Sequence, residues 1–160
     1  EELRGHGVQG VGIGVNEVEI ALELLNEVRL DGILLAGRYT LLDRTGEQLV
    51  RRAQAAGTAV IAGGVFNSGI LATGAVEGAR FNYALASPHI LDRVRALELT
   101  ARRHGVPLAA LALQFPARDP AVTTLLLGAA NARELASSLE DLAWDVPPEA
   151  WAAIEEASSP

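Results

Sequence analysis

Short apolar runs alternate with stretches of helical periodicity along this chain, and the pattern occurs four times. The apolar runs cover residues 8–15, 32–36, 58–62 and 122–127. Each is followed by apolar positions spaced three and four residues apart, as on one face of an α-helix. Continuous apolar strands alternating with amphipathic helices predict a parallel sheet covered by helices. The helices expected to follow the four runs span residues 18–28, 45–55, 90–104 and 131–142.

Local signals define several of these elements further. Gly57 stands where glycine commonly ends a helix, and Asn131 stands where a helix N-cap is expected, with Leu135, Leu139 and Leu142 marking the buried face of that helix. Further helices are predicted over residues 107–114 and 148–157. A long glycine-rich loop is predicted from Phe66 to about Pro88.

Four such units in 160 residues fit two architectures. One is a small doubly wound sheet, and the other is half of an eight-unit barrel, because complete barrels usually need about 250 residues. Both architectures place function at the carboxyl ends of the strands. We therefore expect one functional face, formed by Asn16, Arg38-Tyr39, residues 63–68 and residues 128–131.

Composition narrows the chemistry. The hydrophobic content of 49% and the length predict one globular domain over residues 1–160, and the net charge of −7 argues against a nucleic-acid partner. No apolar run approaches 18 residues and no signal-peptide layout is present, which predicts a cytoplasmic protein without a membrane partner. All 13 basic residues are Arg, and Lys, Cys and Met are missing. Lysine and thiol catalysis by this chain are therefore excluded, and a first residue other than Met suggests a processed or partial chain.

Several motifs fail as sites. The glycines of residues 10–14 lack the spacing of a dinucleotide fingerprint, and the three scattered His residues predict no metal site. Two segments are more informative. The glycine-rich stretch 63–74, continuing to Tyr83, follows a predicted strand and is long enough to be a lid or binding segment. Residues 127–131 lead from a strand into a helix, where free backbone N–H groups would form an anion site.

Four phrases carry a family resemblance: VGIGVN at 11–16, LLAGRYTLLD at 34–43, GVFNSGILATG at 64–74 and LGA at 127–129. In this order they resemble the aldo/keto reductases, closest to the branch that oxidises aldose sugars. The resemblance covers essentially the whole chain. It implies an α/β fold, the C-terminal half (strands five to eight) of a TIM (β/α)8 barrel, as one partial domain of four βα units plus C-terminal helices with the N-terminal half absent.

The same resemblance implies a function. The intact protein would be an NAD(P)-dependent oxidoreductase transferring hydride from a small-molecule sugar or carbonyl substrate. The family's catalytic Asp, Tyr, Lys and His lie in the other half, so this chain contributes no catalytic residue and would be inactive alone. It would self-associate or pair with the missing N-terminal half. The alternatives are a non-catalytic half-barrel that serves in binding or assembly, and a domain that binds phosphate ligands at residues 128–131.

Candidate cofactor-binding residues follow from matching family positions. Asn16 would bind the nicotinamide carboxamide, and residues 66–69 would lie along the pyrophosphate. The full set is Asn16, Phe66, Asn67, Ser68, Gly69, Gly128, Ala129, Asn131 and Ser138, the last four toward the adenosine end. The family's glutamine after strand six is replaced by Ala36 and its nicotinamide-stacking aromatic by Gly63. Glu134 stands where an Arg can hold a 2′-phosphate, so this one charge favours NAD over NADP.

Overall fold

The computed structural model describes residues 2–158 and contains a four-stranded parallel sheet. Its strands follow one another across the sheet in chain order, without a reversal. A doubly wound sheet reverses its strand order near the middle, so the prediction of a doubly wound sheet is wrong. Neighbouring strands that follow the chain order are instead typical of a β/α barrel. The strands are β1 (Gly12–Val15), β2 (Gly32–Ala36), β3 (Ala59–Gly63) and β6 (Thr124–Leu126).

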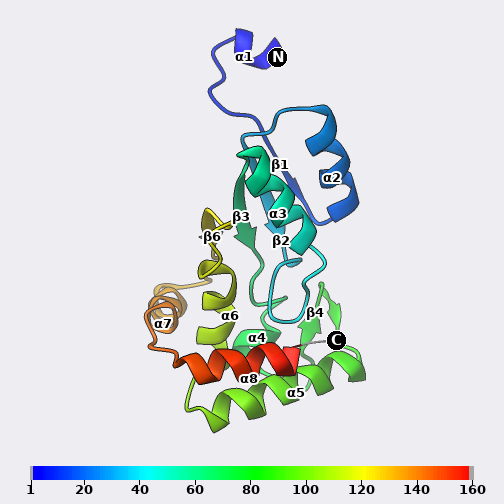
Figure 1. Ribbon diagram of the computed structural model, residues 1–160. Helices are drawn as coiled ribbons and strands as arrows, with labels where there is room; N and C mark the ends of the chain where they lie inside the picture. Colours follow the sequence, from blue (N-terminus) through cyan, green and yellow to red (C-terminus); the bar gives the residue numbers. More distant parts are fainter. Residues whose placement is uncertain (1, 159–160) are drawn as a thin grey trace.

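Helices connect the strands, and two short strands form a separate hairpin. The pair α5 and α8 lie side by side across the end of the sheet toward which β3 points (Figure 1). The helices are α1 (Glu2–Gly5), α2 (Val18–Glu27), α3 (Glu47–Ala56), α4 (Ile70–Thr73), α5 (Pro88–Arg103), α6 (Leu108–Ala117), α7 (Ala132–Leu142) and α8 (Pro148–Ser158), and the hairpin is β4 (Arg80–Phe81) with β5 (Ala84–Leu85).

The main core lies between one face of the sheet and the covering helices. Ile33 and Leu35 of β2 are fully buried, as are Leu49 and Val50 of α3, while the intervening Leu34 is only half-buried. This alternation means that the helices cover one face of β2 completely and that the opposite face is more open. Burial of such side chains contributes about 1.5–3 kcal/mol each relative to exposure, so this layer dominates the stability of the fold.

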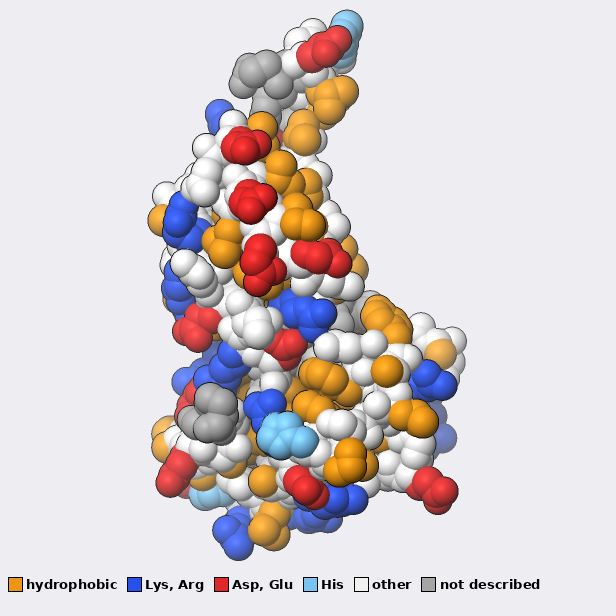
Figure 2. Space-filling model, turned by 90° about the vertical axis from the view of Figure 1, so that its right-hand side faces the viewer, with side chains coloured by type: hydrophobic (Ala, Val, Ile, Leu, Met, Phe, Trp, Pro, Cys, Tyr) orange, Lys and Arg blue, Asp and Glu red, His pale blue; other side chains and the backbone are white. Residues whose placement is uncertain are grey.

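Charge is unevenly distributed over the surface. Helix α2 carries Glu19, Glu23 and Glu27 and no Arg, whereas α5 ends in Arg102 and Arg103. Figure 2 shows acidic side chains gathered on the upper part of the molecule and more arginines on the lower part.

Two predictions of local structure are corrected. The expected loop after Phe66 contains α4 and the β4–β5 hairpin, because short elements of two to four residues leave no periodic signal. The buried leucine face of α7 is wrong: Leu135, Leu139 and Leu142 are 45%, 55% and 37% exposed. Helix α7 follows β6, which pairs only with β3 among the described strands, so α7 packs mainly against α6.

The remaining elements agree with the predicted pattern, with shorter strands at both sheet edges. Residues 8–11 and residues 122, 123 and 127 lie outside strands β1 and β6. Between residues 2 and 158, no helix has both the length and the apolar character needed to cross a membrane.

Candidate functional site

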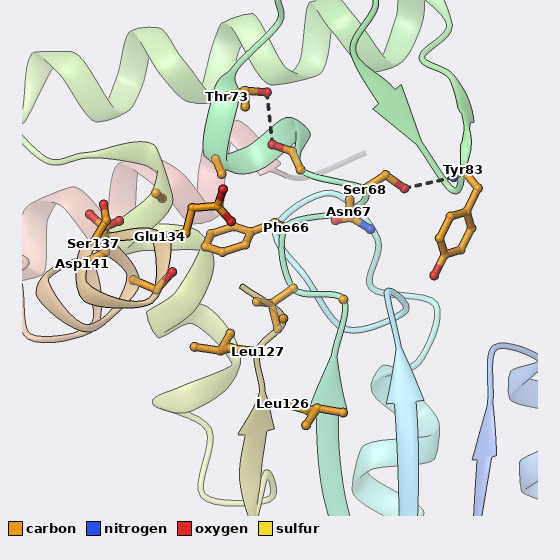
Figure 3. Close-up of a pocket in the computed structure, with 17 residues that line it drawn as sticks. Phe66, Asn67, Ser68, Thr73, Tyr83, Leu126, Leu127, Glu134, Ser137 and Asp141 are labelled. Carbon is orange, nitrogen blue, oxygen red and sulfur yellow. Dashed lines mark hydrogen bonds between the residues drawn. The ribbon is translucent and has the colours of Figure 1, made fainter. Parts of the chain in front are cut away.

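Two adjoining cavities open at the carboxyl ends of the strands. The larger, here called the groove, has a volume of about 600 Å³ and lies between the loop after β3, the loop after β6 and helix α7 (Figure 3). The smaller, here called the side cavity, has a volume of about 150 Å³. The two share part of their walls, formed by Gly64, Asn67, Ser68 and Tyr83.

A close approach of two loops shapes this shared wall. Gly64 has φ of +62°, and a Cβ there would lie 3.1 Å from the backbone nitrogen of Gly37, which itself has φ of +69°. Glycine is needed at such positions because other residues rarely adopt this conformation and because a side chain would separate the loops. The loops after β2 and β3 are thereby held against each other.

The side chain of Asn67 connects the two loops through hydrogen bonds. Its side chain is 2% exposed, its Oδ1 accepts a hydrogen bond from Thr40 Oγ1 at 2.6 Å, and its Nδ2 donates to the carbonyl of Gly37 at 3.2 Å. Buried amides need such partners, since an unpaired one costs about 1–3 kcal/mol. Both ends of this amide are therefore occupied within the protein, and Asn67 positions the loop instead of offering its side chain to a ligand.

The backbone that follows supplies the donors. Asn67 and Ser68 both have left-handed backbones, with φ of 46° and 61°. Within residues 2–158, the N–H groups of Phe66 and Ser68 have no hydrogen-bond acceptor, although Asn67 N–H donates to the Gly64 carbonyl. Backbone N–H groups exposed in turns can form concave sites for anions, and this loop presents two such groups on either side of the occupied Asn67 N–H.

The opposite wall of the groove is acidic. The Glu134 carboxylate accepts hydrogen bonds from Ala130 N–H at 2.9 Å and from Asn131 Nδ2 at 3.0 Å, and Asn131 Oδ1 accepts from Glu134 N–H at 3.0 Å. This reciprocal arrangement is a variant of the capping box, in which the Glu134 carboxylate reaches the N–H of the residue before the N-cap and the N-cap side chain. Free N–H groups were predicted over residues 127–131, and this is wrong for Ala130, because its N–H already donates to the Glu134 carboxylate.

A second carboxyl group, that of Asp141, lines the groove further along α7. Burial, and secondarily the neighbouring Glu140, raises the pKa of the Asp141 carboxyl above its usual value. No arginine or histidine of the described residues lines the groove. The charged side chains that line the groove, Glu134 and Asp141, are therefore both carboxylic acids.

The predicted site residues are distributed as follows. Asn16 lines the side cavity, and Ala129 and Asn131 line neither cavity. Asn16 is exposed, and its backbone carbonyl accepts a hydrogen bond from Arg38 Nε at 3.1 Å. The predicted residues in the groove are Phe66, Asn67, Ser68, Gly69, Gly128 and Ser138.

Tyr39 does not share this face, contrary to expectation. Its ring is 6% exposed and packs against Phe115 at 5.3 Å between centroids, and its hydroxyl donates to Asp119. A buried phenol needs a hydrogen-bond partner, and the Asp119 carboxylate provides one in a separate hollow that Arg51 also lines.

Sequence reasoning missed several lining residues that the fold brings to the groove, among them Ala109, Leu126, Ser137 and Asp141. Asn82 and Tyr83 were noted only as the end of a long loop. The pair Asn82-Tyr83 carried one usable signal, since Asn tolerates the left-handed backbone of tight hairpin turns. The residues of α7 carried none, because their place beside the groove depends on how the helix packs.

The fold and site together define a β/α barrel-type protein with a ligand groove at the carboxyl ends of its parallel strands. Comparison of the sequence with known families then identifies the family: residues 1–159 match the aldo/keto reductase family, to which this chain belongs.

Individual relatives agree with this assignment. The chain is 40% identical over 155 residues to pyridoxal 4-dehydrogenase of Microbacterium luteolum, covering 96% of this chain and 45% of that protein. It is 34% identical over 160 residues to D-threo-aldose 1-dehydrogenase of a Pseudomonas species, covering 98% of this chain and 49% of that protein. The chain thus spans about half the length of the curated relatives it matches.

Solved structures show the same fold. The apo form of aldo-keto reductase AKR11C1 from Bacillus halodurans superimposes with a TM-score of 0.77 at 23% identity, covering 99% of this chain and 54% of that one. Its holo form gives a TM-score of 0.75 at the same identity.

Proposed function

We propose that this chain is the cofactor-binding portion, strands five to eight, of an NAD(P)-dependent aldo/keto reductase. The observation that carries the proposal is the groove at the strand ends, lined by backbone donors on one side and by α7 on the other. Family membership supports it, since the match runs from residue 1 to residue 159.

The groove fits a dinucleotide by its shape and its donors. Gly69 and Gly128 both line it, and a Cβ at either position would meet no atom within 4 Å, so the backbone there is open to close approach by a ligand. The N–H groups of Phe66 and Ser68 would hold the pyrophosphate, and Ser138 would face the adenosine end. Asn16 would hydrogen-bond the carboxamide of the nicotinamide, which when bound supplies the hydride-accepting carbon.

We propose NAD over NADP on the charge of Glu134. Its carboxylate lines the groove and is fixed in place by two hydrogen bonds. A 2′-phosphate at roughly 6 Å from this carboxylate would be repelled by about 1.4 kcal/mol at an effective dielectric constant near 40. A free ribose hydroxyl would instead be able to donate a hydrogen bond to it.

The proposed substrate is a small polar molecule whose reacting carbon is an aldehyde or its cyclic hemiacetal. An aldose and pyridoxal both have this chemical form, and relatives of this chain are named for each. In the cyclic hemiacetal form, the reacting carbon would give its hydrogen as hydride to the nicotinamide and its hydroxyl would give a proton to an acid–base group, so that the hemiacetal becomes a lactone. The acid–base groups are assigned to the other half of the barrel, because this chain has no Lys and its two Tyr lie outside the family's catalytic position.

Calorimetric titration with NADH and NADPH tests the cofactor proposal. We expect NADH to bind about tenfold more tightly, and Glu134→Gln to narrow the difference by improving NADPH binding alone. Gln keeps one acceptor oxygen for the Ala130 N–H, and the hydrogen bond from the N–H of residue 134 to Asn131 Oδ1 does not involve the substituted side chain, so α7 should remain intact. Glu140→Gln is the matched control, because Glu140 lies on the same helix but does not line the groove. Equal affinities for both cofactors would refute the preference, and no binding of either would refute the cofactor site.

The open sheet edges favour a second role, assembly through β1 and β6. Each of these strands pairs with only one neighbour among the described residues, and Leu126 of β6 is 53% exposed. Unpaired edges of a parallel sheet bind further strands readily. We therefore propose that these edges join the chain to a complementary half-barrel or to a second copy of itself.

A further inference from the structure

The turn of the β4–β5 hairpin carries a tyrosine in an unfavourable backbone conformation. Phe81 pairs with Ala84, so Asn82 and Tyr83 form a two-residue turn, and their φ values are 48° and 65°. Two-residue hairpin turns of this type require positive φ at both positions and usually place glycine second. A tyrosine there is strained, and strain of this kind is concentrated at functional sites.

Packing does not compensate for this strain. Tyr83 is 81% exposed, and its hydroxyl forms no hydrogen bond within residues 2–158. The backbone, in contrast, is held firmly: Tyr83 N–H donates to Ser68 Oγ at 3.0 Å, and Arg80 donates to the Tyr83 carbonyl at 2.9 Å. The fold thus fixes the position of this residue while leaving its ring exposed.

The hairpin turn meets a second strained pair at the same place. Asn67 and Ser68 together with Asn82 and Tyr83 are the non-glycine residues with positive φ in the described chain, and all four line the side cavity. The hydrogen bond from Tyr83 N–H to Ser68 Oγ joins the two pairs. Asn16 lines the same cavity from the end of β1.

The direction of the ring distinguishes the two cavities. In Figure 3 the ring of Tyr83 points away from Phe66 and Glu134, which line the groove, and toward the blue strands β2 and β1. The groove and the side cavity meet at Ser68 and Tyr83, so a ligand with two planar ends can place one in each.

We infer that the ring of Tyr83 covers the nicotinamide end of the cofactor when that end enters the side cavity. This inference rests on the proposed function. A planar pyridine ring fits a phenol face, and oxidised nicotinamide is cationic, which adds a favourable cation–π contribution. Tyr83 therefore contributes more to binding of the oxidised cofactor than of the reduced one.

The test compares NAD⁺ with ADP-ribose, which lacks the nicotinamide, by calorimetric titration of this chain. Tyr83→Gly should weaken NAD⁺ binding about tenfold and leave ADP-ribose binding unchanged. The variant should unfold at the same or a higher temperature, because glycine relieves the turn. Tyr83→Phe should retain NAD⁺ affinity. Leu85→Thr is the control, since Leu85 is 71% exposed on the same hairpin and lines neither cavity.

The outcomes separate the two proposals. If the unmodified chain binds neither NAD⁺ nor ADP-ribose, the proposed function fails. If both ligands bind and Tyr83→Gly leaves NAD⁺ affinity unchanged, the inference fails and the proposed function stands. An equal loss for both ligands would mean that the hairpin only supports the loop at Ser68, and would also overturn the ring contact.

Discussion

Asp119 joins three parts of the fold away from the groove, and replacing it tests how much this junction contributes to stability. Its side chain is 8% exposed and accepts hydrogen bonds from both terminal nitrogens of Arg51, at 2.8 and 2.7 Å, and from the hydroxyl of Tyr39. The N–H of Ala121 adds a fourth, at 2.9 Å. The contacts connect α3, the loop after β2 and the segment before β6.

The expected magnitude follows from these bonds. Hydrogen bonds to a charged group contribute about 1.5–3 kcal/mol each, against about 0.5–1.5 for neutral pairs. Arg51 is 46% exposed and can be rehydrated, which reduces the loss. We therefore expect Asp119→Asn to lower the free energy of unfolding by about 2 kcal/mol, and with a urea slope of about 2 kcal/mol per molar the midpoint falls by about 1 M.

The effect should depend on pH in a defined direction. The hydrogen bonds from Arg51, and secondarily from Tyr39, hold the pKa of Asp119 well below its usual range. A carboxyl with a lowered folded pKa stabilises the fold fully above its unfolded pKa of about 3.9 and loses that contribution as pH falls toward the folded pKa. The difference in the free energy of unfolding between the native chain and Asp119→Asn should therefore have its full value at pH 7 and become smaller below about pH 4.

Urea unfolding followed by circular dichroism at pH 7, 5 and 3 measures this difference. Asp92→Asn is the control, because Asp92 is 71% exposed and pairs with Arg95 three residues along the same helix. Such surface pairs contribute about 0–1 kcal/mol. The reasoning is refuted if the two variants lose the same stability at pH 7, or if the Asp119→Asn difference is as large at pH 3 as at pH 7.

Two further predictions concern packing and assembly. Gly46→Ala should destabilise the chain by about 1–3 kcal/mol in the same urea assay, because a Cβ there would lie 2.7 Å from Leu35 Cδ2 and 2.8 Å from the Arg38 carbonyl oxygen. Gly5→Ala, which would meet no atom within 4 Å, should be neutral, and equal midpoints for both variants would contradict the steric argument. In sedimentation velocity the chain should associate through its sheet edges, and Leu126→Lys on β6 should shift it toward monomer; a monomeric native chain at all concentrations would exclude self-association.

The sequence predicted the repeating strands and helices well because their signals are local. Gly57 has φ of +70° and ends α3 as expected, and Asn131 caps α7 through Glu134 N–H. Both features depend on backbone conformation within four residues, which residue type largely determines. The placement of Asn16, Arg38 and Ser68 around one cavity was also predictable, since the ends of parallel strands meet at one face.

Other parts depend on contacts between distant residues, which periodicity does not contain. The hydrogen bond between the Asn67 side chain and Thr40, 27 residues earlier, which holds two loops together, leaves no signal in the sequence. The spacing of Leu135 and Leu139 gave the correct helix and the wrong burial, because an amphipathic pattern does not say whether a neighbour covers the apolar face.

The proposed function requires the groove to bind an anion although its charged lining side chains are acidic. In this proposal the backbone N–H groups of Phe66 and Ser68 supply the positive dipoles for a pyrophosphate, so no Arg or Lys side chain is needed there. No arginine of the described residues lines the groove, so no cation there would neutralise the Glu134 carboxylate on the facing wall. That carboxylate would therefore be able to distinguish a ribose hydroxyl from a 2′-phosphate. The hydrogen bonds of that carboxylate make it part of the fold of α7, so the charge that we propose to favour NAD is also a charge that stabilises the start of the helix. If the proposed function holds, selection of the cofactor and stability of α7 are coupled: a substitution of Glu134 by Arg, chosen to admit a 2′-phosphate, would remove both hydrogen bonds of its carboxylate and place a positive charge at the positive end of the helix dipole.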